Sequence, residues 1–257
     1  MSGEMKSICR KIAILGATSG IAEATARLLA ADGCELALFG RNEERLKAIA
    51  DDLTLRGART ISLHTVDLVS SQSKSAELEK ASQALGGLDG VLLFYGYLGD
   101  QTTANESEAE VRKIIDVNFT SAAEWLTASA EKVSKSDVAK PVILGVSSVA
   151  ADRGRRSNYA YGAAKGGLSL FLQGMAHRMA AESNIRVVSM KLGFVKTPMT
   201  AHMERSGPLW AEPDAIAKSI VKAMNKGGPV QYAPWFWRWI MLAIRTTPAV
   251  IFNKVNL

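Results

Sequence analysis

The sequence predicts an α/β fold of the Rossmann type, in which a doubly wound parallel sheet of about seven strands forms a single domain. Short apolar runs alternate along the chain with longer segments of helical period, and the runs are continuous in Val, Ile and Leu. Such runs are typical of parallel strands that helices cover on both faces. The expected strands are KIAILG (11–16), ELALFG (35–40), TISLHTV (60–66), GVLLFYG (90–96), PVILGVSS (141–148), RVVSMKLG (186–193) and PVQYA (229–233).

The length and composition fit one domain. A chain of 257 residues with 47% hydrophobic content can bury a sizeable core. We expect residues 1–232 to form the Rossmann core and residues 233–257 an amphipathic C-terminal tail. The N-terminus lacks the apolar run of a secretory signal, and no stretch reaches the roughly 20 apolar residues that a membrane span needs. These features predict a cytoplasmic protein.

The excess positive charge lies at the C-terminal end of the chain. The net charge is +6, yet the first 214 residues carry 25 basic and 25 acidic side chains. After Asp214 every charged side chain is basic: Lys218, Lys222, Lys226, Arg238, Arg245 and Lys254. A nucleic-acid-binding protein would spread such residues along a recognition face, so we expect no nucleic-acid partner. The three histidines and two cysteines are scattered, which predicts no metal site.

A glycine-rich turn, GATSGIA (16–22), follows the first expected strand and opens a helical segment. Glycines let the backbone turn sharply and approach a pyrophosphate, which then rests on the N–H groups and the positive end of the helix. The turn therefore predicts a dinucleotide site. Its expected contacts are Gly16, Thr18, Ser19, Gly20 and Ile21.

The ends of the second and third expected strands bear on the choice of cofactor. A carboxylate after the second strand would favour NAD, whereas an arginine accommodates the 2′-phosphate of NADP. The sequence has Arg41 there, which favours NADPH over NADH; the alternative is that Arg41 is a solvated residue at a helix start. Asp67 and Leu68 follow the third strand, where an acidic side chain can accept a hydrogen bond from the adenine amino group.

The expected catalytic residues follow the fifth strand. That strand ends at Ser148, and 13 residues later come Tyr161 and Lys165, which share one helix face because they are four positions apart. With the glycine turn, Asn118 and the segment LGFVKT (192–197), this order resembles the short-chain dehydrogenase/reductase family over nearly the whole chain. The resemblance implies an NAD(P)H-dependent enzyme that reduces a keto group to a hydroxyl.

Each catalytic role follows from the charge that develops on a carbonyl oxygen as it accepts a hydride. Tyr161 would donate the proton, and the Lys165 cation would lower the pKa of the Tyr161 phenol. Ser148 would donate a hydrogen bond to the same oxygen. Asn118, at the kink after the fourth helix, resembles the family residue that holds a water relaying protons to the lysine.

The resemblance extends to further cofactor contacts and has two departures. It implies that Gly96, Val195 and Thr197 bind the cofactor beside Tyr161 and Lys165. However, Tyr-Gly-Tyr at 95–97 replaces the usual Asn-Ala-Gly, and leucine replaces the usual proline before the glycine at 193. Relatives commonly pair the helices around 105–133 and 158–181, which implies a homodimer or homotetramer.

The segments 94–100 and 147–156, together with the tail, resemble one branch of the family, the decaprenylphosphoryl-2-keto-pentose reductases. This resemblance implies a keto sugar carried on a polyprenyl phosphate and a flavin-dependent oxidase as partner. One alternative is a soluble carbonyl substrate such as a ketoacyl or diketone compound. Another is an inactive dinucleotide-binding scaffold, against which the intact catalytic residues argue.

Five side chains are expected on the substrate side. Arg153, Arg155 and Arg156 follow the catalytic strand, where guanidinium groups can bind a phosphodiester; the alternative is a solvated turn. Tyr97 lies in the loop after the fourth strand. Tyr159 has no lysine four positions on, so we expect it to line the pocket and not to donate the proton.

The tail begins with PWFWRWIMLAIR (234–245). On a helix Arg238 and Arg245 fall on almost one line and leave an aromatic and aliphatic surface around them. Such a helix can lie at a lipid interface, which predicts peripheral contact with the inner face of the membrane. The alternative is a helix that caps the substrate pocket or seals a subunit contact.

Overall fold

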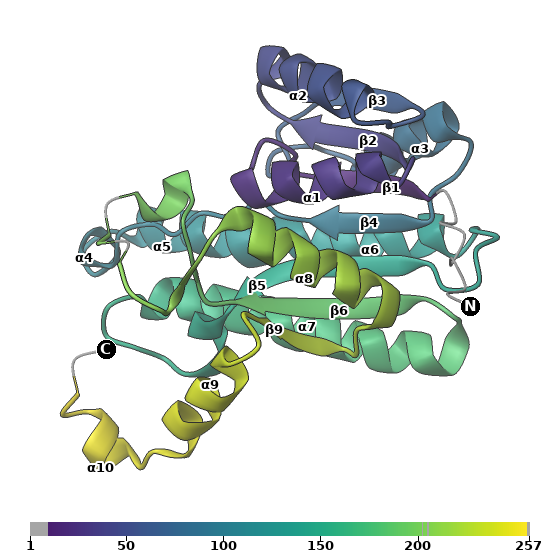
Figure 1. Ribbon diagram of the computed structural model, residues 1–257. Coiled ribbons are helices and arrows are strands. Elements are labelled where there is room, and N and C mark those ends of the chain that lie inside the picture. Colours follow the sequence, from purple (N-terminus) through teal and green to yellow (C-terminus); the bar gives the residue numbers. More distant parts are fainter. Residues whose placement is uncertain (1–9, 202, 205, 256–257) are drawn as a thin grey trace.

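A parallel β-sheet of seven strands forms the centre of the molecule (Figure 1). The computed structural model describes residues 10–201, 203–204 and 206–255; the rest of the predicted domain, namely residues 1–9, 202, 205 and 256–257, lies outside the described residues. The strand order is β3-β2-β1-β4-β5-β6-β9, with every neighbouring pair parallel. The strands are β1 (Lys11–Leu15), β2 (Glu35–Gly40), β3 (Ile61–Thr65), β4 (Gly90–Leu93), β5 (Val142–Ser148), β6 (Arg186–Leu192) and β9 (Val230–Ala233). The predicted doubly wound sheet is confirmed.

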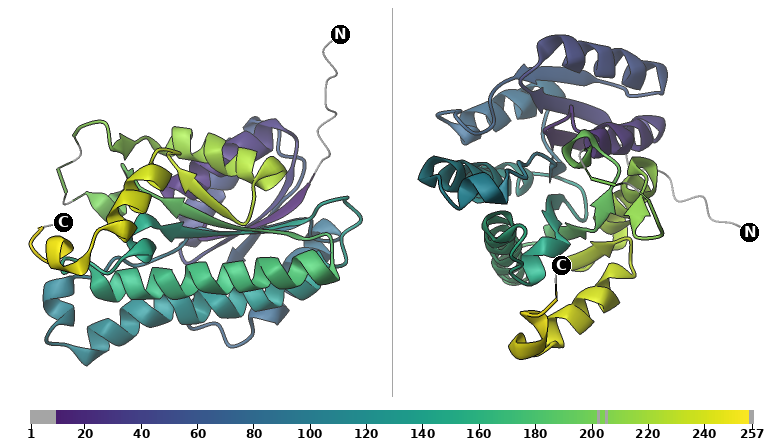
Figure 2. Two further views of the ribbon diagram at one scale, coloured as in Figure 1. Left: turned by 90° about the horizontal axis from the view of Figure 1, so that it is seen from below. Right: turned by 90° about the vertical axis from the view of Figure 1, so that its left-hand side faces the viewer.

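Helices cover both faces of the sheet (Figure 2). One face packs against α1 (Gly20–Ala31), α2 (Glu43–Leu55) and α8 (Pro213–Lys226). The other packs against α3 (Lys74–Leu85), α6 (Ser121–Val133) and α7 (Tyr159–Glu182). Because both faces are covered, side chains on both sides of each central strand are buried, which explains the continuous apolar runs in the sequence.

Local chemistry fixes where several helices begin and end. The side chain of Asn42 caps α2 by accepting from the backbone N–H of Arg45 at 2.9 Å, and Ser73 caps α3 in the same way. At the other end of α3, Gly86 adopts a left-handed conformation with φ of 67°. That conformation favours glycine, so the helix stops there.

Short elements gather at the carboxyl ends of the strands, the edge at which ligands bind in such sheets. After β4 come α4 (Gln101–Ala104), α5 (Glu108–Ile115) and a π-helical segment, η1 (Asp116–Thr120), which leads into α6. After β5 comes the 3₁₀ turn η2 (Val149–Asp152). After β6 come β7 (Phe194–Val195), η3 (Pro198–Thr200) and β8 (Trp210–Ala211).

The C-terminal tail packs beside the edge strand β9. Its helices are α9 (Trp237–Thr246) and α10 (Ala249–Phe252), and both extend from the end of β9 (Figures 1 and 2). The helix starts three residues later than the segment 234–245 suggests, because Pro234 to Phe236 form a turn in which the carbonyl of Pro234 accepts from Trp237 N–H. Among the described residues, no helix combines the length and apolar character that crossing a bilayer requires.

Candidate active site

A cavity of ≈ 500 Å³ at the carboxyl ends of the strands joins the glycine turn to the expected catalytic residues. Thr18 and Gly20 line one end of it, and Ser148, Tyr161 and Lys165 line the other. Three further residues that were expected to bind the cofactor, Gly96, Val195 and Thr197, also line this cavity. One elongated ligand can therefore contact both groups of residues.

The glycine turn has room for a phosphate at the start of α1. Gly16 has φ of 85°, and a Cβ there would lie 2.9 Å from the backbone nitrogen of Tyr95, so Gly16 packs against the segment after β4 and does not line the cavity. At Gly20 a Cβ would meet nothing within 4 Å. Ser19 and Ile21 line the cavity on either side of Gly20. Because the first N–H groups of a helix lack intrahelical acceptors, this open space suits the pyrophosphate of a dinucleotide.

Two arginines follow β2, the strand that pairs with β1 beside the glycine turn. Arg41 follows β2 and is exposed, and it does not line the cavity. Arg45, in the first turn of α2, does line it and lies 3.9 Å from Glu23. Sequence reasoning missed Arg45 because an arginine in an exposed helical turn is more often solvated than bound.

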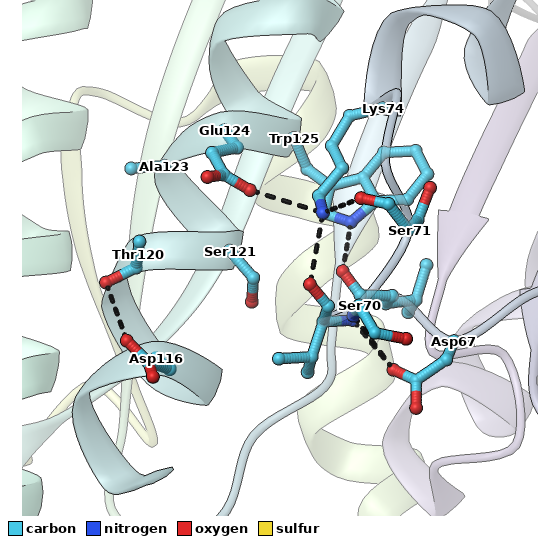
Figure 3. Close-up of polar contacts among 12 residues, drawn as sticks. Asp67, Ser70, Ser71, Lys74, Asp116, Thr120, Ser121, Ala123, Glu124 and Trp125 are labelled. Carbon is cyan, nitrogen blue, oxygen red and sulfur yellow. Dashed lines mark hydrogen bonds and ion pairs between the residues drawn. The ribbon is translucent and has the colours of Figure 1, made fainter. Parts of the chain in front are cut away.

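Side chains of α3 and α6 anchor the loop after β3 (Figure 3). Asp67 accepts from the backbone N–H of Val69 at 2.8 Å, and the carbonyl of Leu68 accepts from the buried indole N–H of Trp125 at 2.8 Å. The buried Lys74 donates to the Val69 carbonyl at 3.1 Å and pairs with Glu124 at 3.2 Å. Asp67 and Leu68 thus lie in a fixed loop and do not line the cavity.

Ser148, Tyr161 and Lys165 come together because β5 ends beside the first turns of α7. The Ser148 side chain hydrogen-bonds the phenol of Tyr161, and Ser148 Oγ also accepts from Ala150 N–H at 3.1 Å. Lys165 is 3% exposed, and its Nζ donates to the Val146 carbonyl at 3.1 Å. A serine and a tyrosine hydroxyl therefore face one part of the cavity, with a buried amine next to them.

The expected lowering of the Tyr161 pKa is wrong for this arrangement. Burial raises the pKa of Tyr161 to about 12 and outweighs the hydrogen bond from Ser148. Burial also lowers the pKa of Lys165 to about 8. The Lys165 Nζ lies 6.0 Å from the centre of the Tyr161 ring, so the ammonium does not offset the loss of water around the phenol. At pH 7 the tyrosine holds its proton, as a proton donor must.

Asn118 lies behind the cavity wall, at the π-helical kink η1. Its Nδ2 donates to the carbonyls of Tyr97 at 2.6 Å and Ile114 at 2.8 Å, and its Oδ1 accepts from Tyr97 N–H. A Cβ at Gly96 would lie 2.9 Å from Asn118 Oδ1 and 3.3 Å from Lys165 Nζ. Asn118 therefore holds the loop after β4 close to Lys165.

Neither tyrosine expected on the substrate side lines the cavity. The Tyr97 hydroxyl donates to Glu110 at 2.9 Å, and Lys113 stacks over its ring at 4.2 Å, so Tyr97 belongs to the packing of α5. Tyr159 is 49% exposed, and its hydroxyl donates to Asn105 at 2.7 Å. The expectation that Tyr159 lines the pocket is wrong because the start of α7 turns its side chain toward α4.

The arginine cluster divides into three separate environments. Arg153 donates to the carbonyls of Ile244 and Thr247 at 2.5 Å each, and its guanidinium lies 3.8 Å from the centre of the Phe252 ring. Arg153 therefore binds the tail and not a phosphodiester. Arg156 is exposed and lies outside the cavity.

Arg155 is the member of the cluster that lines the cavity. Its Nη2 lies 3.4 Å from Met241 Sδ of α9, and its Nε is buried without a hydrogen-bond partner. Burial lowers the pKa of its guanidinium, although the charge of Asp152 opposes this effect. Asn158, which also lines the cavity, has a buried Oδ1 without a partner. Arg155 and Asn158, three positions apart in the sequence, therefore both line the substrate end of the cavity.

The tail contributes a contact that sequence reasoning missed. Trp237 is 3% exposed and packs so closely on Gly193 that a Cβ at that glycine would overlap the indole ring. Phe194, which lines the cavity, meets the same ring edge-on at 5.4 Å. Helix α9 thus supports the cavity wall at the end of β6 from the side away from the cavity. The feature of the sequence that could have indicated this contact is the glycine after Leu192, because only glycine leaves room for the indole ring.

No metal centre accompanies these residues in the part of the chain that the structure describes. There, no three His, Cys, Asp or Glu side chains gather so that they could hold a metal ion. His202, one of the three histidines, lies outside the described residues.

The fold and the site together define an α/β oxidoreductase that binds a dinucleotide.

Comparison with known proteins places the chain in a family. A model described as short chain dehydrogenase matches residues 10–207. An uncharacterized oxidoreductase of Mycobacterium tuberculosis is 30% identical, and the match covers 95% of this chain and 96% of the relative. Another uncharacterized oxidoreductase, from Streptomyces coelicolor, is 30% identical over 96% of each chain. The chain therefore belongs to the short-chain dehydrogenase/reductase family and is an NAD(P)-dependent enzyme.

Solved structures share the fold at low sequence identity. Levodione reductase superposes with a TM-score of 0.76 at 22% identity and covers 87% of this chain and 95% of its own. A short chain dehydrogenase from Mycobacterium paratuberculosis bound to NAD has a TM-score of 0.77 at 19% identity, covering 88% and 97%. A variant of actinorhodin polyketide ketoreductase with NADPH has a TM-score of 0.76 at 20% identity, covering 89% and 97%.

Proposed function

We propose that this enzyme uses NADPH to reduce the keto group of a sugar carried on a polyprenyl phosphate. The bound cofactor supplies the hydride to the carbonyl carbon. Tyr161 gives its proton to the carbonyl oxygen, because its phenol is protonated at neutral pH and lies beside the Ser148 hydroxyl at the cavity wall. Ser148 orients that oxygen by a hydrogen bond. The product is the corresponding alcohol.

The observation that carries the choice of substrate is Arg155. A guanidinium that lines the cavity suits an anionic group such as a phosphodiester, which it can bind through charge-assisted hydrogen bonds. Asn158 also lines the cavity, and its side-chain amide suits a hydrogen bond with a sugar hydroxyl. A substrate that carries both a phosphate and hydroxyl groups near its ketone meets both needs.

The preference for NADPH rests on the two arginines near the adenosine end. Arg41 is exposed after β2, and Arg45 lines the cavity one turn into α2. Two cations here favour a 2′-phosphate over a 2′-hydroxyl.

The proposal also includes a partner enzyme, a location in the cell and an oligomeric state. The resemblance of segments 94–100 and 147–156 and of the tail to the decaprenylphosphoryl-2-keto-pentose reductases supports a flavin-dependent oxidase that forms the keto sugar. A polyprenyl substrate supports a location at the inner face of the membrane. Pairing of two copies through α6 and α7 is supported by Leu170, which is 71% exposed on α7.

The test compares a polyprenyl-phosphoryl keto sugar with a small diketone in an NADPH oxidation assay. We expect Arg155→Ala to raise the KM for the lipid-linked substrate by about 10- to 100-fold and to leave that for the diketone within about twofold. Arg156→Ala is the matched control, because Arg156 lies outside the cavity. Equal effects of Arg155→Ala on both substrates would favour the alternative, a reductase of soluble ketones.

A further inference from the structure

Exposed apolar side chains are concentrated in the tail. Of the twelve large hydrophobic side chains that are exposed in the described residues, six lie between positions 235 and 255. These six are Trp235, Trp239, Leu242, Val250, Ile251 and Val255. Trp235 is 72% exposed and Trp239 is 59% exposed, although tryptophan is usually largely buried.

The two faces of α9 have different roles. Trp237 and Met241, four positions apart, are buried against Val149 at the cavity wall. Trp239 and Leu242, three positions apart, are exposed on the other side of the helix, and Trp235 in the turn before α9 is exposed as well. The helix has thus already packed its inner face on the core, and its outer face is a second, separate apolar surface.

Long-range contacts hold this outer face in place. Arg153 binds the carbonyls of Ile244 and Thr247 at the end of α9, and its guanidinium stacks on Phe252 of α10. Beneath the helix, the Tyr232 hydroxyl donates to the buried Asp152 at 2.8 Å. Because both helices are tied to the loop after β5, the exposed apolar face keeps its orientation.

Basic side chains border this apolar face. The Arg238 guanidinium lies 5.8 Å from the centre of the Trp239 ring, and Lys254, just after α10, is exposed. The sequence has no acidic side chain after Asp214 to offset them. An apolar face with tryptophans and a basic border is the combination that lies at the surface of an anionic bilayer.

We infer that the exposed surface of the tail, comprising Trp235, Trp239, Leu242, Val250, Ile251 and Val255 with Arg238 and Lys254, docks on a bilayer that contains anionic phospholipid. This inference rests on the membrane location proposed above and identifies the surface of the enzyme that would contact the membrane. A second copy of the chain fits less well, because a two-fold contact through this face would bring the same basic side chains together without acidic partners.

The docking surface lies close to the active site. Met241 on the inner face of α9 contacts Arg155, which lines the cavity. An α-helix with its side chains is about 10–12 Å across, so a bilayer on the outer face lies on the order of one helix diameter from the cavity wall. A substrate can then reach the active site while its polyprenyl chain remains in the bilayer.

Co-sedimentation with vesicles tests the inference without cofactor or substrate. The full-length chain is mixed with vesicles of phosphatidylcholine alone or of phosphatidylcholine with phosphatidylglycerol. We expect sedimentation with the anionic vesicles, and a loss of binding of about tenfold or more in the variant Trp235→Ser/Trp239→Ser. Leu55→Ser, which removes an 89% exposed leucine on α2, is the matched control and should bind as the wild type does.

A second pair of variants separates local charge from net charge. Arg238→Glu/Lys254→Glu should lose binding to anionic vesicles, whereas Lys218→Glu/Lys222→Glu, with the same change in net charge on α8, should retain most of it. Normal activity of the tryptophan variant on a water-soluble diketone would show that it folds. The inference is overturned if wild-type protein stays in the supernatant, if both charge pairs act alike, or if the tryptophan variant only turns a dimer into a monomer. The substrate proposal can fail in its own assay while vesicle binding stands.

Discussion

Arg155 Nη2 lies 3.4 Å from Met241 Sδ, which joins a cation of the active-site cavity to the C-terminal helix. On the same helix, Trp237 packs against Gly193 at the end of β6. The tail is therefore part of the wall of the active site as well as an appended amphipathic helix. Of the two interpretations of PWFWRWIMLAIR, packing at the pocket describes its inner face, and its outer face remains available to a membrane.

Arg153→Ala should loosen the tail. The substitution removes the charged donor from the carbonyls of Ile244 and Thr247, and hydrogen bonds to charged groups contribute about 1.5–3 kcal/mol each. We expect the free energy of unfolding in urea to fall by about 2 kcal/mol, and amide exchange in residues 237–252 to become faster. Lys218→Ala, which changes an exposed residue of α8, should change it by less than about 0.5 kcal/mol. Similar losses in both variants would contradict the assigned contacts.

Gly193→Ala should destabilise the protein through Trp237. The added methyl group would overlap the indole ring, and overpacking of this kind costs about 1–3 kcal/mol. The cost should be smaller when Trp237→Leu is already present, because the smaller side chain leaves room for the methyl group. Thermal unfolding of both single variants and of the double variant measures this coupling. Additive effects would show that the two residues do not touch.

Lys165→Met should stabilise the folded enzyme at pH 7 while abolishing its activity. Burial lowers the Lys165 pKa from 10.5 to about 8, so holding the ammonium in the fold costs about 3 kcal/mol below pH 8. Leaving the Val146 carbonyl unpaired offsets about 1–2 kcal/mol of the gain. A net gain of about 1–2 kcal/mol in the free energy of unfolding is expected.

The lowered pKa of Lys165 also determines how the stability gained in Lys165→Met depends on pH. Between about pH 8 and 10.5 the unfolded wild type binds the proton that the folded form has lost, so wild-type stability rises with pH. The advantage of Lys165→Met should therefore shrink across this interval. Urea unfolding at pH 7 and pH 10 tests the sign, and an advantage that grows with pH would show that Lys165 is not destabilised by burial.

Arg41→Ala and Arg45→Ala should each weaken the preference for NADPH. Loss of one charged contact to a 2′-phosphate should lower the ratio of kcat/KM for NADPH to that for NADH by about tenfold. Arg56→Ala, an exposed arginine at the other end of α2, should leave the ratio unchanged. The preference for NADPH would have to be abandoned if neither Arg41→Ala nor Arg45→Ala lowered it.

Local patterns in the sequence were enough to predict the sheet and many of the residues that line the cavity. Continuous apolar runs predicted the seven strands, and the glycine turn and the spacing of Tyr161 and Lys165 predicted residues that one cavity brings together. The apolar runs and these motifs both consist of residues close together in the chain, so they can be recognised in the sequence alone.

Contacts between segments that are distant in the sequence could not be predicted from it. The partners of Arg153 lie 91 and 94 positions away, and Trp237 of α9 meets the glycine between β6 and β7. The direction of Tyr159 depends on Asn105, 54 positions earlier. The pKa of Tyr161 depends on how completely the fold excludes water from it, which its spacing from Lys165 does not show.

The most direct test of the proposed reaction follows the hydride itself. Wild-type enzyme and Tyr161→Phe are incubated with a polyprenyl-phosphoryl keto sugar and with NADPH in which both hydrogens at C4 of the nicotinamide are replaced by deuterium. A small diketone is tested in parallel, and the alcohols are analysed by mass spectrometry. We predict that wild type places deuterium on the carbinol carbon of the sugar, that Tyr161→Phe forms almost none of this product, and that the diketone reacts less efficiently. Unlabelled alcohol from wild type, or a Tyr161→Phe variant as active as wild type, would contradict the proposed reaction.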